Sequence, residues 1–135
     1  MGVFKNDAEV HKYIGGVFEK GLADPEIGPK LSASGVVLQI NYTDPDAAVT
    51  VDLPNGKVFA GATDIKPDVE LFMSADTGNG FWQGKVNLSV AMAKGQVRTK
   101  GPVQKILKLV PTAKLLFPAY RAMLEADGRS DLQQK

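Results

Sequence analysis

The spacing of apolar residues changes from a helical period to a period of two at Gly35, and this change restricts the chain to folds in which helices cover a sheet. Before Gly35, apolar residues recur at intervals of three and four, which predicts a helix over residues 7–22. After it, apolar and polar residues alternate, which predicts four strands, at 36–42, 47–53, 57–62 and 68–73. A strand with one apolar face needs a covering layer on that face.

Turn and helix signals give the order of the other elements. Pro54-Asn55-Gly56 predicts a hairpin turn, because asparagine and glycine accept positive φ at little cost. Beyond the fourth strand, the patterns predict two short helices, an edge strand at 96–100 and two C-terminal helices. Pro111 is expected to end the first of these two helices, Thr112 to cap the second, and Pro118 to kink it. The whole order predicts an α+β fold with one sheet and helices gathered on one of its faces.

The length of 135 residues favours one domain over residues 1–135. The chain has no cysteine, so its core forms without disulfides. Its longest apolar runs are about six residues, far below the roughly 18 that span a bilayer, and a soluble protein is expected. Residues 112–125 are predicted to form a C-terminal amphipathic helix, and residues 126–135 a frayed tail.

Acidic and basic residues are separated along the chain. Residues 77–124 contain no acidic residue but hold eight of the sixteen lysines and arginines, whereas twelve of the fifteen carboxylates lie at or before Asp76. Apolar residues between cations suit a ligand with an anionic head, or an anionic membrane surface. Nucleic acid is disfavoured, because the residues between the cations are mostly aliphatic and the net charge is only +1.

Side chains for catalysis or metal binding are scarce. His11 is the only histidine, and it is expected at the surface or the edge of the core. Asp44 and Asp46 flank a proline in a predicted turn, which is ordinary turn chemistry. The segment 78–80 lacks the strand and the lysine of a phosphate-binding loop, and no serine lies in a nucleophile motif. We therefore expect no enzyme activity, no cofactor and no metal site.

Three segments carry a family resemblance: the strand pair around the asparagine-glycine turn (Val49–Gly56), the strand Pro67–Ser74, and Ala91–Gly101, where a basic strand lies between two glycines. Their order and spacing, with a helix ahead of them, resemble the sterol carrier protein type 2 family, the non-specific lipid-transfer proteins. The resemblance implies a five-stranded, mainly antiparallel sheet under helices, with an apolar tunnel between them for a lipid, sterol or fatty acyl ligand.

The chain departs from the family pattern at two places. Gly78 and Gly80 stand in the segment 75–82, where the family usually carries acids and leucines, so a poorer helix and a looser tunnel wall are expected there. The chain ends Gln133-Gln134-Lys135 instead of in the small-basic-leucine signal of peroxisomal members. We therefore expect a bacterial, single-domain member that is cytoplasmic.

Apolar residues of the second half are the candidate ligand contacts. The resemblance implies a ligand between the sheet and the helices over 74–94 and 102–125, and we expect the segment 112–125 to act as a lid. Cations at the tunnel mouth would then orient a carboxylate, phosphate or coenzyme A head. The predicted contacts are Phe81, Trp82, Leu88, Met92, Val103, Ile106, Leu115, Leu116, Tyr120 and Met123.

The expected function is non-enzymatic binding and transfer of a fatty acid, fatty acyl-CoA, sterol or phospholipid, with transient contact with an anionic membrane surface. Two other interpretations stay open. The same apolar residues can simply fill the core, as such stripes usually do. They can also form a surface for homodimerisation or for docking on an enzyme of lipid metabolism. We expect a monomer or a weak homodimer.

Overall fold

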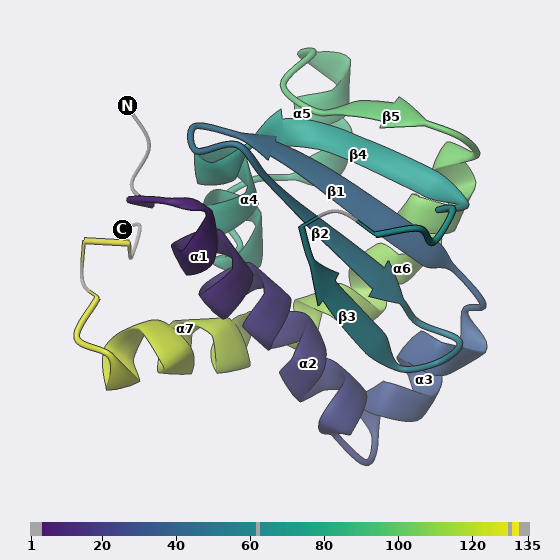
Figure 1. The fold of residues 1–135 in the computed structure, drawn as a ribbon, viewed down its shortest axis with the longest axis horizontal. Coiled ribbons are helices and arrows are strands. Elements are labelled where there is room, and N and C mark those ends of the chain that lie inside the picture. Colours follow the sequence, from purple (N-terminus) through teal and green to yellow (C-terminus); the bar gives the residue numbers. More distant parts are fainter. Residues whose placement is uncertain (1–3, 62, 130, 133–135) are drawn as a thin grey trace.

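The computed structural model describes residues 4–61, 63–129 and 131–132. Its centre is one five-stranded sheet in the order β3-β2-β1-β4-β5 (Figure 1). β1, β2 and β3 form an antiparallel meander, whereas β4 crosses back to pair with β1 in parallel. β5 is antiparallel to β4, so the sheet is mixed but mainly antiparallel. The strands are β1 (Val37–Thr43), β2 (Ala47–Asp52), β3 (Lys57–Ala60), β4 (Val69–Ser74) and β5 (Arg98–Lys100).

The helices lie on one side of the sheet, and the predicted α+β class is confirmed. Figure 1 shows α4 and α6 behind the sheet and α2 beside β3. In the described residues, no helix is both long and apolar enough to cross a membrane. In chain order the helical elements are α1 (Asp7–Val10), the π-helical turn η1 (His11–Gly15), α2 (Gly16–Ala23), α3 (Ile27–Ala33), α4 (Ala75–Trp82), α5 (Leu88–Ala93), α6 (Val103–Lys114) and α7 (Phe117–Ala126).

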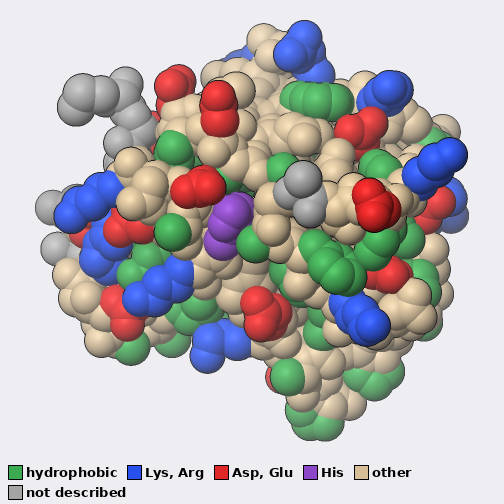
Figure 2. Space-filling view, viewed as in Figure 1, with side chains coloured by type: hydrophobic (Ala, Val, Ile, Leu, Met, Phe, Trp, Pro, Cys, Tyr) green, Lys and Arg blue, Asp and Glu red, His purple; other side chains and the backbone are tan. Residues whose placement is uncertain are grey.

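In the part of the chain that the structure describes, no helix lies over the outer face of the sheet (Figure 1). Figure 2 shows this face with acidic and basic side chains interspersed over it. The residues of β1 alternate between buried and partly exposed positions, as expected for a strand with one covered face. A cavity for an apolar ligand is therefore expected between the covered face and the helices.

The first helical run, over residues 7–23, begins as its sequence predicts. Asn6 caps it, because the side-chain oxygen of Asn6 accepts the backbone N–H of Glu9 at 3.1 Å. The run passes through a π-helical turn that ends at Gly15. A Cβ atom on Gly16 would lie 2.8 Å from Cε of Met123, so the absence of a side chain lets α7 pack closely against this run.

The two prolines of the C-terminal part act differently from the prediction. Pro111 does not end a helix: it lies inside α6, which continues to Lys114 and therefore also contains Thr112. Pro111 removes one backbone hydrogen bond, but apolar side chains on both sides of it keep facing the core, and their burial holds the helix in place. Pro118 does not kink a helix either, because it lies in the first turn of α7, where its missing N–H has no helical partner to lose.

The segment after α7 differs from the expected frayed tail in its described residues. Leu132 is fully buried and belongs to the hydrophobic core. Arg129 forms ion pairs with Glu9 and Asp131, at 2.6 and 2.9 Å. This segment therefore closes the end of the core between α4 and the first helical run. Residues 130 and 133–135, which the prediction also covered, lie outside the described residues.

Candidate functional site

A cavity of about 60 Å³ lies between the inner face of the sheet and the helices. Leu38, Ile40 and Tyr42 of β1 and Leu71 and Met73 of β4 form its floor. Side chains alternate between the two faces of a strand, so the period of two in the sequence puts these five residues on one face. The parallel register places Ile40 beside Leu71 and Tyr42 beside Met73. The floor is thus a continuous apolar surface across two strands.

Helices α4 and α6 form the opposite wall of the cavity. α6 contributes Ile106, Leu109, Val110 and Ala113, and their spacing of three and four residues places them on one face of an amphipathic helix. α2, α3 and the start of α5 close the sides. The lining residues outside the floor are Phe18, Leu31, Leu53, Gly78, Phe81, Trp82, Leu88, Ile106, Leu109, Val110, Ala113 and Leu116.

The glycine in the middle of α4 makes close packing possible. A Cβ atom on Gly78 would lie 2.7 Å from Cε1 of Tyr42 and 3.4 Å from Cδ1 of Ile14. α4 is nevertheless a regular helix, capped by Ser74, whose hydroxyl accepts the N–H of Thr77 at 3.1 Å. The expectation of a poor helix and a loose wall is therefore wrong: Gly78 lets the helix lie directly on the ring of Tyr42.

Aromatic rings form one end of the cavity. The ring of Trp82 meets Phe18 and Phe81 edge-on, with centroids 5.1 and 5.2 Å apart. Phe117 at the start of α7 packs edge-on against Phe81, with centroids 5.4 Å apart. Edge-to-face pairs add a preferred geometry to the burial of apolar area. They fix the position of Trp82, the only tryptophan of the chain, beside the cavity.

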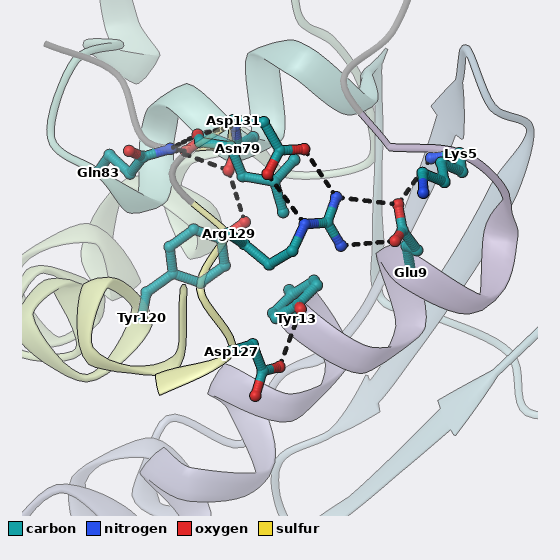
Figure 3. Close-up of polar contacts among 10 residues, drawn as sticks. Lys5, Glu9, Tyr13, Asn79, Gln83, Tyr120, Asp127, Arg129 and Asp131 are labelled. Carbon is teal, nitrogen blue, oxygen red and sulfur yellow. Dashed lines mark hydrogen bonds and ion pairs between the residues drawn. The ribbon is translucent and has the colours of Figure 1, made fainter. Parts of the chain in front are cut away.

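A buried polar cluster joins α4, α7 and the C-terminal segment (Figure 3), and its Tyr120 ring stacks on Trp82 with centroids 6.3 Å apart. The hydroxyl of Tyr120 donates to Oδ1 of Asn79 at 2.7 Å. Gln83 Nε2 donates to the same oxygen at 2.9 Å, and Nδ2 of Asn79 donates to the carbonyl of Leu132 at 2.8 Å. Because buried polar groups are costly without partners, this cluster fixes the relative positions of the three segments.

A second group of polar contacts joins the C-terminal segment to the first helical run (Figure 3). The guanidinium of Arg129 pairs with Glu9 and lowers the pKa of that carboxyl below its ordinary value. The hydroxyl of Tyr13 donates to Asp127 at 2.9 Å, and Lys12 pairs with the same carboxylate and lowers its pKa. These contacts are structural, since none of these side chains lines the cavity.

Among the described residues that line the cavity, Tyr42 alone has a titratable side chain. Burial raises the pKa of its hydroxyl far above the ordinary value of 10.0, so the group stays neutral at any physiological pH. The lining is therefore suited to apolar groups and unsuited to a charged one.

An open cleft of about 480 Å³ adjoins the cavity on the outside of α4 and α6. Phe81, Leu88 and Val110 line both spaces and thus separate them. The cleft is polar on one part of its surface, where Lys85, Asn87 and Ser89 come from the α4–α5 connection and α5, and Lys114 comes from the end of α6. Its other residues are Gly84, Val86, Leu107, Pro111 and Phe117.

The ten predicted contact residues divide into two sets. Phe81, Trp82, Leu88, Ile106 and Leu116 line the cavity and are brought together there. The other five lie elsewhere. Met92 is half-buried against the core and Val103 is half-buried at the start of α6, whereas Leu115 is 51% exposed. Tyr120 belongs to the polar cluster, and Met123 packs on Gly16.

The predicted lid over 112–125 also differs from the structure. Ala113 and Leu116 do line the cavity, but Tyr120 and Leu124 are fully buried in the core beside the first helical run. The wall that covers the floor opposite β4 is α6. The apolar spacing over 103–114 is that of one continuous helix, but the prediction that Pro111 ends a helix divided this segment in two.

Sequence reasoning missed the floor as a set of contact residues. The signal was present in the alternation of Leu38, Ile40 and Tyr42, which predicted the strand but was not extended to the ligand. It also missed Asn79 and Gln83, because polar side chains next to glycines are typical of exposed segments. Their spacing of four residues, which places them on one helix face, was the available signal.

The sequence model of the SCP-2 sterol transfer family matches residues 17–114, which is most of the chain. The chain belongs to this family. The match includes the whole sheet and the helices on both sides of the cavity, and it confirms the resemblance stated from the three segments. Among curated proteins, none matches the sequence.

Solved structures with the same fold include several members of this family. Sterol carrier protein 2 from Yarrowia lipolytica, in the apo form, is 23% identical, with a TM-score of 0.63 over 75% of this chain and 87% of that one. The sterol carrier protein domain 2 of Helicoverpa armigera is 22% identical, with a TM-score of 0.65 over 78% and 88%. A UbiJ-SCP2 ubiquinone synthesis protein is 15% identical, with a TM-score of 0.65 over 81% and 96%. These likenesses show the fold.

Proposed function

We propose that the protein is a non-enzymatic carrier that takes a lipid into the cavity between the sheet and α6 and releases it to an acceptor. Family membership supports the binding and transfer of lipids or other hydrophobic molecules. The observation that carries the proposal is the cavity lining. Its described side chains come mainly from five helices and from β1 and β4, and they are apolar except for the Tyr42 hydroxyl and the Trp82 indole N–H. Hydrophobic transfer at about 0.8 kcal/mol per buried methylene is enough to hold an alkyl chain without specific contacts.

The cavity has to widen to accept such a ligand. Its volume of about 60 Å³ is well below the lower end of ordinary small-molecule sites, which is roughly 300 Å³. α6 is suited to be the movable wall, because Ile106 is its one fully buried residue while Leu107 is 39% exposed. A movement of α6 away from β4 enlarges the cavity without disturbing the sheet.

The ligand classes that fit this proposal are a fatty acid, a fatty acyl-CoA, a sterol and a phospholipid. We place the carrier in the cytoplasm and expect it to meet anionic membranes transiently through the basic half of the chain, which holds the exposed Lys105, Lys108 and Lys114. Transfer to phosphatidylglycerol vesicles should then slow as salt rises, because the screening length falls to about 8 Å at physiological ionic strength.

Native mass spectrometry of the purified protein tests the proposal. The expected spectrum contains a monomer with a hydrophobic adduct, which organic extraction removes and added lipid restores. A second candidate function is a dimerisation or protein-interaction module of lipid metabolism, which the exposed side chains of Val90, Leu107 and Leu115 favour. An adduct-free dimer that binds no added lipid contradicts the carrier and supports this second candidate.

A further inference from the structure

Two asparagine-glycine pairs occur in the chain, and the fold places them in opposite environments. Asn55-Gly56 forms the tip of the turn between β2 and β3, and both residues are exposed. Asn79-Gly80 lies inside α4, and both residues are buried. An asparagine is chemically labile before a glycine, because a residue without a Cβ atom lets its backbone nitrogen approach the asparagine side chain closely. The environment of each pair therefore decides whether it reacts.

The reaction in question is an intramolecular deamidation. The deprotonated backbone nitrogen of the glycine attacks Cγ of the asparagine, and the new N–Cγ bond closes a succinimide ring. The Cγ–Nδ2 bond breaks, and the amide nitrogen leaves as ammonia with the proton that the glycine gave up. Water then opens the ring at either carbonyl and leaves aspartate or isoaspartate. Water is the sole co-reactant, and nothing is oxidised or reduced.

The turn between β2 and β3 leaves the reacting atoms accessible. Gly56 has a φ of +66°, and a Cβ atom built on it would meet nothing within 4 Å. Its N–H donates to the carbonyl of Leu53 at 3.2 Å, which is the long end of the normal range. Nδ2 of Asn55 donates to Oδ2 of Asp52 at 2.8 Å, a contact that engages the leaving nitrogen but not the attacked carbon. Water and hydroxide reach this exposed turn directly.

The pair in α4 is held away from the reactive geometry. Oδ1 of Asn79 accepts from Tyr120 and from Gln83, and its Nδ2 donates to the carbonyl of Leu132. Ring closure would break these bonds and unwind the helix at Gly80. Opening a buried and fully bonded segment costs nearly as much as global unfolding. Asn79 should therefore react only in unfolded molecules.

We propose that Asn55 is a site of spontaneous deamidation in the folded protein, and that the product loosens the β2–β3 turn. The new carboxylate at position 55 lies against Asp52, which is buried and loses the amide donor to its Oδ2. Two like charges at this distance repel each other. Isoaspartate also lengthens the main chain of a short turn, and turn length fixes the register of a hairpin such as β2 with β3. The inference is independent of the carrier function.

Peptide mapping measures the reaction at both pairs in one sample. The folded protein is incubated at pH 7 and at pH 9, and circular dichroism confirms that it stays folded. Cleavage by trypsin places the two pairs in separate peptides, 31–57 and 58–85, since the bond before Pro67 resists cleavage. Mass spectrometry gives the fraction of amide converted to acid in each peptide, and fragmentation separates Asn55 from Asn41.

We expect Asn55 to convert at least about tenfold faster than Asn79 in the folded protein. The rate should be higher at pH 9, because the glycine nitrogen attacks in its deprotonated form. In urea, where the fold no longer distinguishes the pairs, the two rates should agree within about threefold. Equal rates in the folded protein would overturn the inference. It would also fail if Asn55 converts in urea but not in the folded protein, because the turn would then be protective.

Variants at position 55 test the effect of the product. Asn55→Gln keeps an amide but makes ring closure unfavourable, so it should abolish conversion in peptide 31–57 apart from any at Asn41. Asn55→Asp introduces the charge of the product, and Asn55→Ala is its matched control, because it removes the same amide without adding charge. We expect Asn55→Asp to have the lower Tm at pH 7, since only its side chain repels Asp52. Equal Tm values for these two variants would overturn the loosening of the turn.

Discussion

The hydroxyl of Tyr120 on α7 donates a hydrogen bond of 2.7 Å to the side-chain oxygen of Asn79 on α4, and both residues are fully buried. This contact ties the last helix to the helix that forms one wall of the cavity. It explains why the segment predicted to be a lid is part of the core. It also shows that α4 packs between two elements: the ring of Tyr42 lies against Gly78 on one side, and α7 lies on the other.

Replacing Tyr120 with phenylalanine should lower the free energy of unfolding by about 1–2 kcal/mol, because the ring still packs but the hydrogen bond is lost. Asn79 Oδ1 keeps its bond from Gln83, so the loss stays moderate. Urea unfolding measures it. Asn79→Leu should cost more, since it leaves the Tyr120 hydroxyl and the Leu132 carbonyl without this partner. A Tyr120→Phe variant as stable as the wild type would show that the contact contributes nothing.

The buried side chain of Leu132 should contribute strongly to stability although it lies three residues before the last one in the sequence. Leu132→Ala should lower the free energy of unfolding by about 2–4 kcal/mol, because it leaves a cavity in the core. Leu115→Ala is the matched control, and it should have an effect below about 0.5 kcal/mol, since that side chain is 51% exposed. Equal effects of the two variants would contradict the packing of the C-terminal segment.

Replacing either of two helical glycines with alanine should change the free energy of unfolding, but in opposite directions. Gly78→Ala should destabilise the protein by about 1–3 kcal/mol, because its Cβ would lie 2.7 Å from the ring of Tyr42. Gly15→Ala should stabilise it by up to about 1 kcal/mol, because the nearest atom is Cγ1 of Val58 at 3.8 Å and alanine is the better helix former. Thermal and urea unfolding of both variants check the signs. A stabilising Gly78→Ala would mean that α4 can move away from β1.

The contacts of Arg129 should make stability depend on acidic pH. Hydrogen bonds from Arg129 lower the pKa of Glu9 and of Asp131 below the ordinary values of 4.5 and 3.8. A lowered folded-state pKa adds stability above the ordinary pKa, and this stability is lost as pH falls through the folded value. Arg129→Gln should therefore lower the Tm at pH 7 but have little effect at pH 2. A Tm difference that is the same at both pH values would assign the effect of Arg129 to packing.

A larger side chain at the boundary between cleft and cavity should hinder passage of an alkyl chain. Val110 is half-buried and lines both spaces, so Val110→Phe should slow the Trp82 fluorescence change on mixing with dodecan-1-ol. Leu107→Phe, in the cleft alone, is the control and should leave that rate unchanged. Stopped-flow mixing measures both rates. Equal rates in the two variants would mean that the chain enters by another route.

Periodicity predicted the elements of this fold well, because helices and strands are local. Alternating residues located β1, β2, β3 and β4, and the helical period located the first helical run. The helix boundary near Pro111 was not predictable in the same way. There, the rule that proline ends a helix competes with burial of the side chains on either side of it, and only the tertiary contacts decide.

The site was predicted only in part, because the set of residues that meet there also depends on tertiary contacts. Phe81 and Trp82 of α4 and Ile106 of α6 were identified, whereas Leu109, Val110 and Ala113 of α6 were not. Leu115, Met92 and Met123 have the same apolar character but lie outside the cavity. Which apolar residues meet depends on how far each helix is rotated and shifted over the sheet. The position of the C-terminal segment depends on Asn79 and Gln83, which hold Leu132 from 53 and 49 residues away.

The parallel pairing of β1 with β4 also determines how the chain can fold. The β1–β2–β3 meander needs only short turns, so its pairs form between neighbours in the sequence. The central pair joins Leu38 to Val69 and therefore requires a loop that includes the rest of the meander. Closing long loops is the slow step for folds rich in distant contacts. We expect the meander to form early, and the floor of the cavity, which needs both β1 and β4, to be completed late in folding.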